Sequence, residues 1–439
     1  MFQTLANAWK VADIRKKILY TLLIVLIFRV GSAIPVPFID IAALGEAVKG
    51  NSDSTAMALL TLMSGGGFSD ASIFALSITP YINASIIIQL LTVAIPALER
   101  MAQNGEEGRK KLGQITRYVT VILGLLLGVA YYFMVKNKYG ALAACAKGGF
   151  AAWFCGITIV LCFTAGSALM MWLGEQINER GIGNGISILL FAGIISRLPD
   201  GFVLLYQLFT QGIDTIDKGG LKYVILVPII LVLFLAIIGL IVFMSNAERR
   251  IPIQYAKRTV GRKIYGGQNT FIPIKVNMSG VMPIILAVSI VSMPSILKQF
   301  FGWDADNTSW FFQAFSSTSW VYIILYFLLI IGFAFFYVQI QYNPIEMANN
   351  LRKNSGAIPG YRPGKPTVDY IRKVISKITL IGALFLGVIA LFPSIFGKFT
   401  GIGLGIGGTS VMIVVGVALE TMQQIESQIM MRHYKGFLE

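Results

Sequence analysis

The chain has 439 residues, of which 56% are hydrophobic and only 13% are charged. Its apolar runs recur too often and are too long to be the strands of a soluble core, so the composition excludes a soluble globular protein. The formal net charge is +15, from 36 Lys and Arg residues against 21 Asp and Glu.

Ten apolar stretches of roughly 20 residues follow one another along the chain, and this is the length that a helix needs to cross a bilayer. They begin near Ile18, Ile73, Ile115, Trp153, Gly185, Tyr223, Val276, Trp320, Ile375 and Gly405. The sequence therefore predicts an all-α polytopic membrane protein with ten transmembrane helices.

The N-terminal segment, residues 1–17, is polar and amphipathic, and no small-residue cleavage site follows it. We therefore expect the first helix to remain as a membrane span. Arg29 lies late in this span, and we expect its long side chain to reach the outer interface.

Residues 64–91 combine glycines, Pro80 and polar groups with an apolar span, in the order SGGGFSDASIFALSITPYINASIIIQLL. A helix that only anchors a protein in lipid has no need of such interruptions. Glycine and proline interrupt a membrane helix only where protein or water can satisfy the freed backbone groups. This segment is therefore predicted to line an internal cavity.

Five spans fall in residues 1–210 and five in residues 211–439. An odd number of spans in each half gives the two halves opposite orientations, as in an inverted repeat. Proteins built in this way place their pathway at the interface between the halves. We therefore predict two inverted five-helix halves around a central pore.

Lysine and arginine set the orientation, because the loops rich in them stay in the cytoplasm. With both termini in the cytoplasm, the cytoplasmic segments hold 26 of the 36 Lys and Arg residues and 11 carboxylates. The opposite loops hold nine of each sign. The reverse topology violates the rule, so both termini are predicted to be cytoplasmic.

Two of the cytoplasmic loops, at about residues 245–275 and 341–373, are long and basic. The first alternates IPIQY and FIPIK segments around a basic tip, which predicts a β-hairpin-like projection. The second contains NLRKNSGAIPGYRPGKPT, whose glycines and prolines are too closely spaced for a helix. Both loops are expected to stand above the membrane as docking surfaces.

Motifs for catalysis or cofactors are missing from the sequence. It has no GxxxxGK[ST] phosphate loop, and its sole histidine, His433, has no second histidine for a metal site. We therefore expect no enzyme activity and no cofactor. A secondary transporter is the alternative, although it usually needs ionisable groups at mid-membrane, where this chain has very few.

Six segments carry a resemblance to a known family, in the right order and over nearly the whole chain. They read SGGGFSDASIFALSITPYINASIIIQLL, NERGIGNGISILLFAGI, QYAKRTVGRKIYGG, IKVNMSGVMPIIL, SGAIPGYRPGKPT and GIGGTSVMIVVGVALE. The chain resembles the SecY family, the channel subunits of the bacterial Sec translocase. The resemblance implies a channel that passes unfolded secretory polypeptides across the plasma membrane and releases hydrophobic segments sideways into lipid.

The resemblance also implies a mid-membrane ring of apolar side chains. The matching positions are Ile78, Ile82, Ile186, Leu190, Met282 and Ile413. Such a ring closes by apolar contact and dewetting, and it excludes ions without binding any polypeptide sequence strongly. Taken singly, each of these residues is better explained by ordinary helix packing, and only the motif context favours the ring.

A plug at about residues 56–74 is implied outside this ring, formed by a short helix. Gly65, Gly66 and Gly67 would give it the backbone freedom to move. The alternative, from composition alone, is that the same segment is a flexible external loop.

A lateral gate is implied between the second and third spans and the seventh and eighth. Asn83, Gln89 and Asn277 are its polar candidates. Buried amides tend to pair across a helix interface, for about 1 kcal/mol, which a signal helix could displace. They could equally be static contacts.

The family uses the two basic loops to bind partners. The resemblance implies docking of the SecA motor ATPase and the ribosome, alongside SecE and SecG subunits, signal peptides, nascent membrane proteins and anionic lipids. The candidate docking residues are Lys257, Arg258, Arg262, Lys263 and Arg362. The alternative explanation is that the positive-inside rule alone accounts for the positive charge of these loops.

Overall fold

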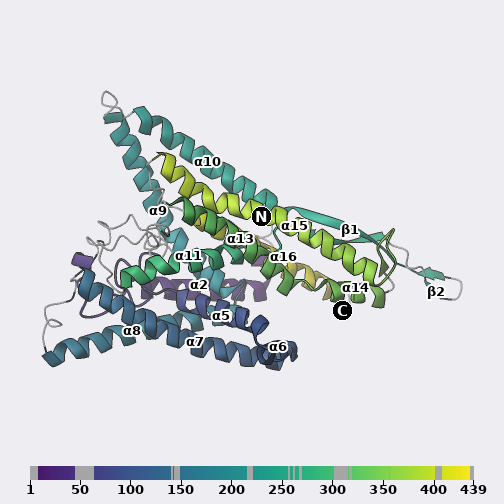
Figure 1. Ribbon diagram of the computed structural model, residues 1–439, viewed down its shortest axis with the longest axis horizontal. Helices are drawn as coiled ribbons and strands as arrows, with labels where there is room; N and C mark the ends of the chain where they lie inside the picture. Colours follow the sequence, from purple (N-terminus) through teal and green to yellow (C-terminus); the bar gives the residue numbers. More distant parts are fainter. Residues whose placement is uncertain are drawn as a thin grey trace.

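The computed structural model describes residues 8–44, 64–139, 142, 149–214, 221–255, 258–260, 263–265, 269–300, 315, 319–354, 356–400 and 408–435. Within these ranges a long helix lies at the place of each predicted span. They are α2 (Ala12–Ala33), α5 (Thr79–Ala94), α7 (Gly105–Phe133), α8 (Gly149–Arg180), α9 (Gly185–Asp214), α10 (Leu221–Asn246), α11 (Met282–Phe300), α13 (Trp320–Gln341), α15 (Lys365–Thr400) and α16 (Gly408–Lys435). Figure 1 shows them as an elongated bundle.

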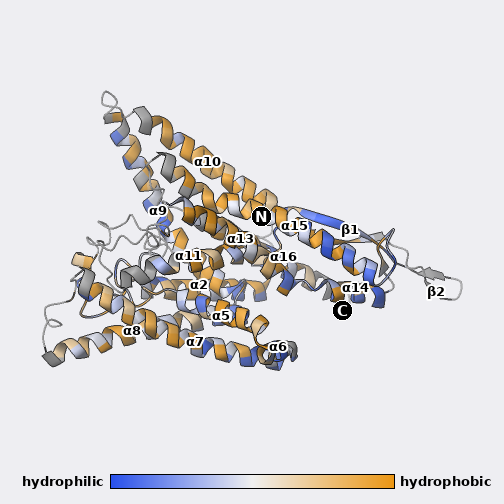
Figure 2. Cartoon of the chain, in the orientation of Figure 1, coloured by the Kyte–Doolittle hydropathy of each residue, from blue (hydrophilic) through white to orange (hydrophobic). Residues whose placement is uncertain are grey.

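Six of these helices are long and apolar enough to cross a membrane, by length and composition. A seventh candidate is the bent pair of α5 and α6 (Pro96–Gln103), whose axes differ by 106°. The outer faces of the helices carry exposed apolar side chains, such as Leu126 on α7 and Leu235 on α10. The helices are accordingly mostly orange in Figure 2. This is a multi-pass helical membrane protein, and ten crossings stays a prediction.

The packing of the helices leaves a seam on one side of the bundle. α7 packs along α8 and α5, while α11 packs along α13, which in turn packs along α15. α7 and α11 touch only over a short stretch. The two groups are also joined through α9 and α16, because α9 packs against α8 and α16, and α16 packs against α15.

A tight turn between α8 and α9 brings these helices close together. The Oδ1 of Asn178 accepts a hydrogen bond from the Gly185 amide at 2.7 Å, and the Oδ1 of Asn184 accepts one from the Ile186 amide at 3.2 Å. Gly185 lies against the backbone carbonyl of Gly174, so closely that a Cβ atom there would overlap its oxygen. In the NERGIGNG segment, two asparagine side chains therefore accept the first amides of α9, and a glycine allows its backbone to approach α8 closely.

The first long basic loop is a β-hairpin, as predicted. Strand β1 (Glu248–Tyr255) pairs antiparallel with β4 (Asn269–Lys275), with Ile251 opposite Ile272. Ile251 and Ile253 are buried, together with Ile371 of α15. Alternate residues thus fix the base of the hairpin on the bundle, while β2 (Arg258–Val260) and β3 (Lys263–Tyr265) pair farther out (Figure 1).

The second long loop contains more helix than predicted. Helix α14 (Pro344–Lys353) includes the segment NLRK, and α15 begins at Lys365, inside the glycine- and proline-rich segment. The Oδ1 of Asn343 caps α14 by accepting the Ile345 amide at 3.1 Å. Only the stretch between the helices is irregular, with the two-residue strand β5 (Gly356–Ala357) pairing with β1.

The remaining described element is η1 (Met134–Tyr139), a π-helical turn that extends α7. It carries Met134 and Val135 into a buried cluster with Phe68 and Phe163. This cluster fills the space between α7, α8 and the segment before α5.

Replacing Gly185 with alanine tests the close approach of α8 and α9. The added methyl group overlaps the Gly174 carbonyl, so Gly185→Ala should lower the free energy of unfolding by about 1–3 kcal/mol. The measurement is thermal unfolding of the purified protein in detergent. The control is Gly239→Ala on α10, where a Cβ meets no atom within 4 Å and alanine favours the helix by about 1 kcal/mol. Equal melting temperatures for the two variants would contradict this packing.

Candidate functional site

An apolar cluster lies where α5, α9 and α16 meet. Four of its buried residues come from these helices. They are Ile78, which is the N-cap of α5, Ile82 of α5, Leu190 of α9 and Ile413 of α16. Ile186, one turn before Leu190 on α9, packs against it. Side chains from helices far apart in sequence thus meet in one apolar cluster.

A cavity of about 370 Å³ adjoins this cluster. Its wall includes the apolar residues Leu190, Val281, Met282, Ile285, Ile413 and Val417. It also includes the polar residues Asn184, Ser187, Asn277, Gln341, Glu420 and Gln423. Lys275 lies at its rim and donates from Nζ to the Oε1 of Gln423 at 2.5 Å. A space that water can fill therefore lies directly beside a dry cluster.

The structure brings the six predicted ring residues into one region. Five of them lie in or against the apolar cluster, and Met282 shares the cavity wall with Leu190 and Ile413. Their role as a ring stays a prediction. Sequence reasoning missed the residues packed behind them, Phe28 of α2 and Met170 of α8, because single apolar residues in a span carry no distinguishing signal.

The glycine turn, residues 64–70, precedes α5. Gly65 and Gly66 have φ values of +63° and +95°, a region that favours glycine, while a Cβ on Gly67 would collide with the Ser72 side chain. Residues 64–74 form consecutive turns rather than the expected helix, and residues 56–63 of the predicted plug lie outside the described residues. A plug role for this segment stays a prediction.

Two contacts fix the glycine turn and the segment that follows it. The hydroxyl of Tyr131 on α7 donates to the Phe68 carbonyl at 2.7 Å, and the two rings meet edge-on with centroids 4.9 Å apart. The Ile73 amide donates to the Ile34 carbonyl at 3.0 Å, beside a β-bridge between Pro35 and Ser72. No local sequence pattern predicts the Tyr131 contact, since Phe68 lies 63 positions earlier.

Arg29 of α2 reaches across to α9, and its expected reach to the outer interface stays a prediction. Its Nη2 donates to the backbone carbonyl of Ala192 on α9 at 3.2 Å, and its guanidinium lies 5.7 Å from the Phe28 ring centroid. A carbonyl within the bundle gives this cation a partner that the sequence did not reveal.

Comparison with known proteins decides the family. A family model described as SecY matches residues 72–422. The chain belongs to the SecY family. It is 43% identical to the protein translocase subunit SecY of Streptomyces galbus over 448 residues, with 100% of each chain covered. The subunit of the same name from Bacillus subtilis is 43% identical over 444 residues, again with complete coverage of both.

Solved structures share the SecY-family fold. The structure titled as that of a protein conducting channel has a TM-score of 0.65 at 19% identity, covering 94% of this chain and 92% of that one. Sec61 in the canine ribosome-channel complex from the endoplasmic reticulum has a TM-score of 0.60 at 17% identity, with the same coverage.

Among the described residues, no hydrogen bond joins the residues predicted for a SecY-type lateral gate. Asn83 and Gln89 lie half-buried on α5, and in the described part of the chain neither bonds to Asn277. Asn277 lines the cavity, and its buried Oδ1 has no hydrogen-bond partner among the described residues. The expected amide pair across the seam is therefore not formed here, and the gate role stays a prediction.

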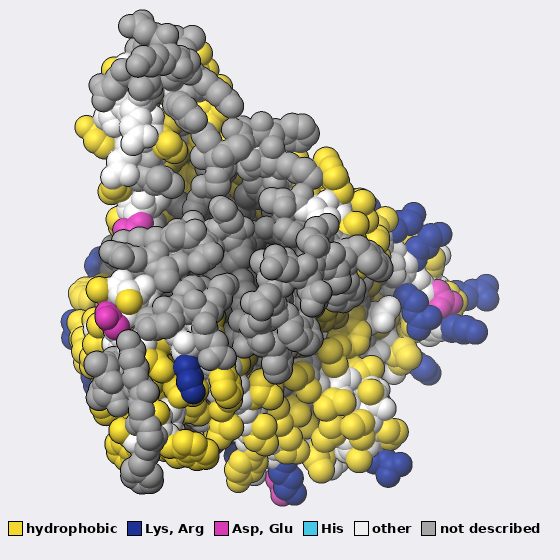
Figure 3. Space-filling model, turned by 60° about the vertical axis from the view of Figure 1, so that its left-hand side comes forward, with side chains coloured by type: hydrophobic (Ala, Val, Ile, Leu, Met, Phe, Trp, Pro, Cys, Tyr) yellow, Lys and Arg dark blue, Asp and Glu magenta, His cyan; other side chains and the backbone are white. Residues whose placement is uncertain are grey.

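Three of the five predicted docking residues are described, and they lie at one end of the molecule (Figure 1). Arg258 and Lys263 begin strands β2 and β3, Lys257 and Arg262 lie outside the described residues, and Arg362 is exposed between β5 and α15. Described Lys and Arg side chains gather at the right-hand edge of Figure 3. Within the described residues, no cluster of His, Cys, Asp and Glu could hold a metal ion.

Truncating Leu190 tests the apolar seal of this SecY-family site. Leu190→Ala should cost about 2–5 kcal/mol of unfolding free energy, because the side chain is buried. It should also raise the resting ion conductance, since the cavity water gains a path through the cluster. The measurement is current across planar bilayers containing the purified protein.

The control is Leu126→Ala on α7, where the side chain is 56% exposed on the outer face. This variant should leave the conductance unchanged. Equal currents from the two variants would show that Leu190 does not seal the pathway.

Proposed function

We propose that this chain is a protein-conducting channel of the bacterial plasma membrane. It passes unfolded secretory polypeptides across the bilayer and releases hydrophobic segments sideways into lipid. The observation that carries the proposal is the apolar cluster of Ile78, Ile82, Leu190 and Ile413 beside a partly polar cavity, in a chain of the SecY family.

The proposed seal is the ring of Ile78, Ile82, Ile186, Leu190, Met282 and Ile413. A narrow apolar constriction excludes ions because water leaves it, yet it offers no directional bonds to a passing polypeptide. A varied substrate is therefore accepted without strong binding. The ring closes again by contact between its own side chains.

The proposed plug is the segment around residues 56–74, hinged at Gly65, Gly66 and Gly67. The positive φ values of the first two glycines support a backbone pivot at this place. The proposed lateral exit is the seam between α7 and α11, which touch over a short stretch only. Asn83, Gln89 and Asn277 line or flank this exit.

The proposed orientation has both termini in the cytoplasm, and the hairpin and the loop around Arg362 as docking sites. The basic character of these loops supports it. The proposed partners are SecE and SecG subunits, the SecA motor ATPase, the ribosome, signal peptides, nascent membrane proteins and anionic lipids. A structural neighbour described as a ribosome-channel complex supports the ribosome in particular.

Transport into vesicles tests this function. The protein, reconstituted with its small subunits, should move a signal-bearing precursor to a protease-protected lumen when motor and ATP are supplied. Arg362→Glu should slow this transport by about tenfold or more, because opposing like charges costs several kcal/mol at an interface. Vesicles that protect no precursor with the wild-type protein would refute the proposed function.

The matched control is Arg15→Glu, a charge reversal at an exposed position of α2. It should transport normally and insert in the membrane to the same level as Arg362→Glu. Normal transport by Arg362→Glu would remove Arg362 from the docking surface while leaving the channel function intact.

A further inference from the structure

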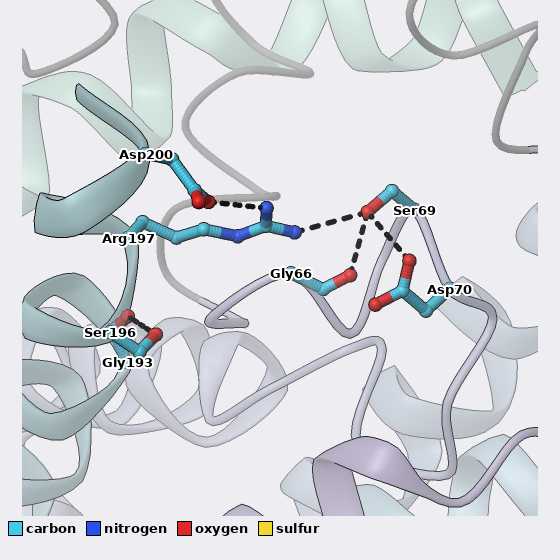
Figure 4. A network of polar contacts seen from close by, with 7 residues as sticks. All are labelled: Gly66, Ser69, Asp70, Gly193, Ser196, Arg197 and Asp200. Carbon is cyan, nitrogen blue, oxygen red and sulfur yellow. Dashed lines mark hydrogen bonds and ion pairs between the residues drawn. The ribbon is translucent and has the colours of Figure 1, made fainter. Parts of the chain in front are cut away.

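Arg197 on α9 reaches across to the glycine turn. Its Nη2 donates to the Oγ of Ser69 at 3.3 Å, and its Nη1 pairs with the Oδ2 of Asp200 at 2.9 Å (Figure 4). Asp200 is one turn farther along α9 and is mostly exposed. Its ion pair with Arg197 therefore orients the guanidinium without covering it. The contact joins positions 128 residues apart in sequence.

The guanidinium also lies flat against the bare backbone of Gly66. A Cβ on Gly66 would stand 2.5 Å from the Arg197 Cζ and 2.7 Å from its Nε, closer than any real side chain allows. The Nε is buried and has no hydrogen-bond partner among the described residues. Burying this donor is unfavourable, so the position is maintained by the contacts of the other two nitrogens.

One turn of α9 cradles the glycine turn. A Cβ on Gly65 would lie 3.3 Å from the Gly193 backbone and 3.2 Å from the Ser196 hydroxyl, so the two backbones are nearly in contact. The Oγ of Ser69 donates in turn to the Gly66 carbonyl at 2.7 Å, which closes the turn under the guanidinium. The glycine turn therefore lies between α9, the Arg197 side chain and Arg29 of α2, whose Nη1 would be 3.1 Å from a Cβ on Gly65.

The same helix carries the apolar cluster. Leu190 and Arg197 are seven residues apart on α9, which places them on the same face and about 10 Å apart along the axis. A displacement of α9 that moves Leu190 out of the cluster therefore also moves the guanidinium away from Ser69. Pro199 lies inside α9 two residues beyond Arg197 and removes the helical hydrogen bond to the Ile195 carbonyl, so the coupling requires the turns between Leu190 and Arg197 to move as one unit.

We propose that Arg197 is a latch, a positioning residue that holds the glycine turn on α9 while the channel is closed and releases it when α9 moves. The latch makes release of the segment before α5 depend on opening of the apolar cluster. The proposed role of the latch rests on the proposed channel function, but the contact of Arg197 with the glycine turn can be tested separately.

Amide hydrogen exchange tests the latch in the reconstituted complex without precursor. Arg197→Ala should make the amides of residues 67–72 exchange about tenfold faster, the loss expected for a hydrogen bond to a charged group. In Arg197→Lys these amides should exchange at a rate between those of the wild type and Arg197→Ala, because lysine keeps the charge but lacks the planar guanidinium. The same order should appear in the resting leak of halide from the vesicles.

The matched control is Arg117→Ala, which removes a different arginine contact between elements, the ion pair of Arg117 Nε on α7 with Glu175 Oε1 on α8 at 2.8 Å. It should leave exchange of residues 67–72 unchanged. Exchange in Arg197→Ala that equals the wild type or Arg117→Ala would overturn the latch. Should Arg197→Ala fail to assemble, the lysine variant decides by the same comparison.

Precursor transport by the wild-type protein separates the two proposals. Normal transport with unchanged exchange in the arginine variants would refute the latch alone. Faster exchange in Arg197→Ala, with no transport by the wild type, would support the latch contact and refute the channel function.

Discussion

The rest of the structure depends on the apolar contact at the junction of α5, α9 and α16. Leu190 and Ile413 belong to this apolar cluster and also line a cavity whose wall includes Asn277 and Glu420. A space that water can fill therefore borders directly on closely packed apolar side chains. Apolar side chains attract one another without directional bonds, and a seal made from them can therefore open for many sequences and close again. A polar ring would bind particular segments and leave unpaired groups when empty.

Close backbone approach holds the helices that carry this junction. Gly185 packs on the Gly174 carbonyl and fixes α9 against α8, while Gly65 and Gly66 bring the glycine turn onto α9. Lipid gives apolar helices no reason to associate, so small residues and backbone contacts have to supply the attraction. α9 is thus the element that contacts both the apolar cluster and the glycine turn.

Local patterns in the sequence predicted much of the fold and little of the pairing. The alternation in IPIQY and FIPIK predicted the β1 and β4 hairpin, and apolar runs predicted the helices. α7 nevertheless begins at Gly105, before its apolar run, because pairs such as Glu106 and Lys110 extend the helix beyond the apolar segment. The candidate ring came from motif context. The contacts of Tyr131, Arg29 and Arg197 join distant positions, which no local pattern encodes.

Site-specific cross-linking to a precursor arrested in transit tests the central claim most directly. Photoreactive residues at Ile82, Ile186 and Met282 should form adducts with the precursor, and those at the exposed positions Ile87, Ile195 and Ile290 of the same helices should not. Adducts confined to the first set would place the polypeptide within the apolar cluster. No adduct at any of the three, with the precursor demonstrably engaged, would contradict a pathway through this junction.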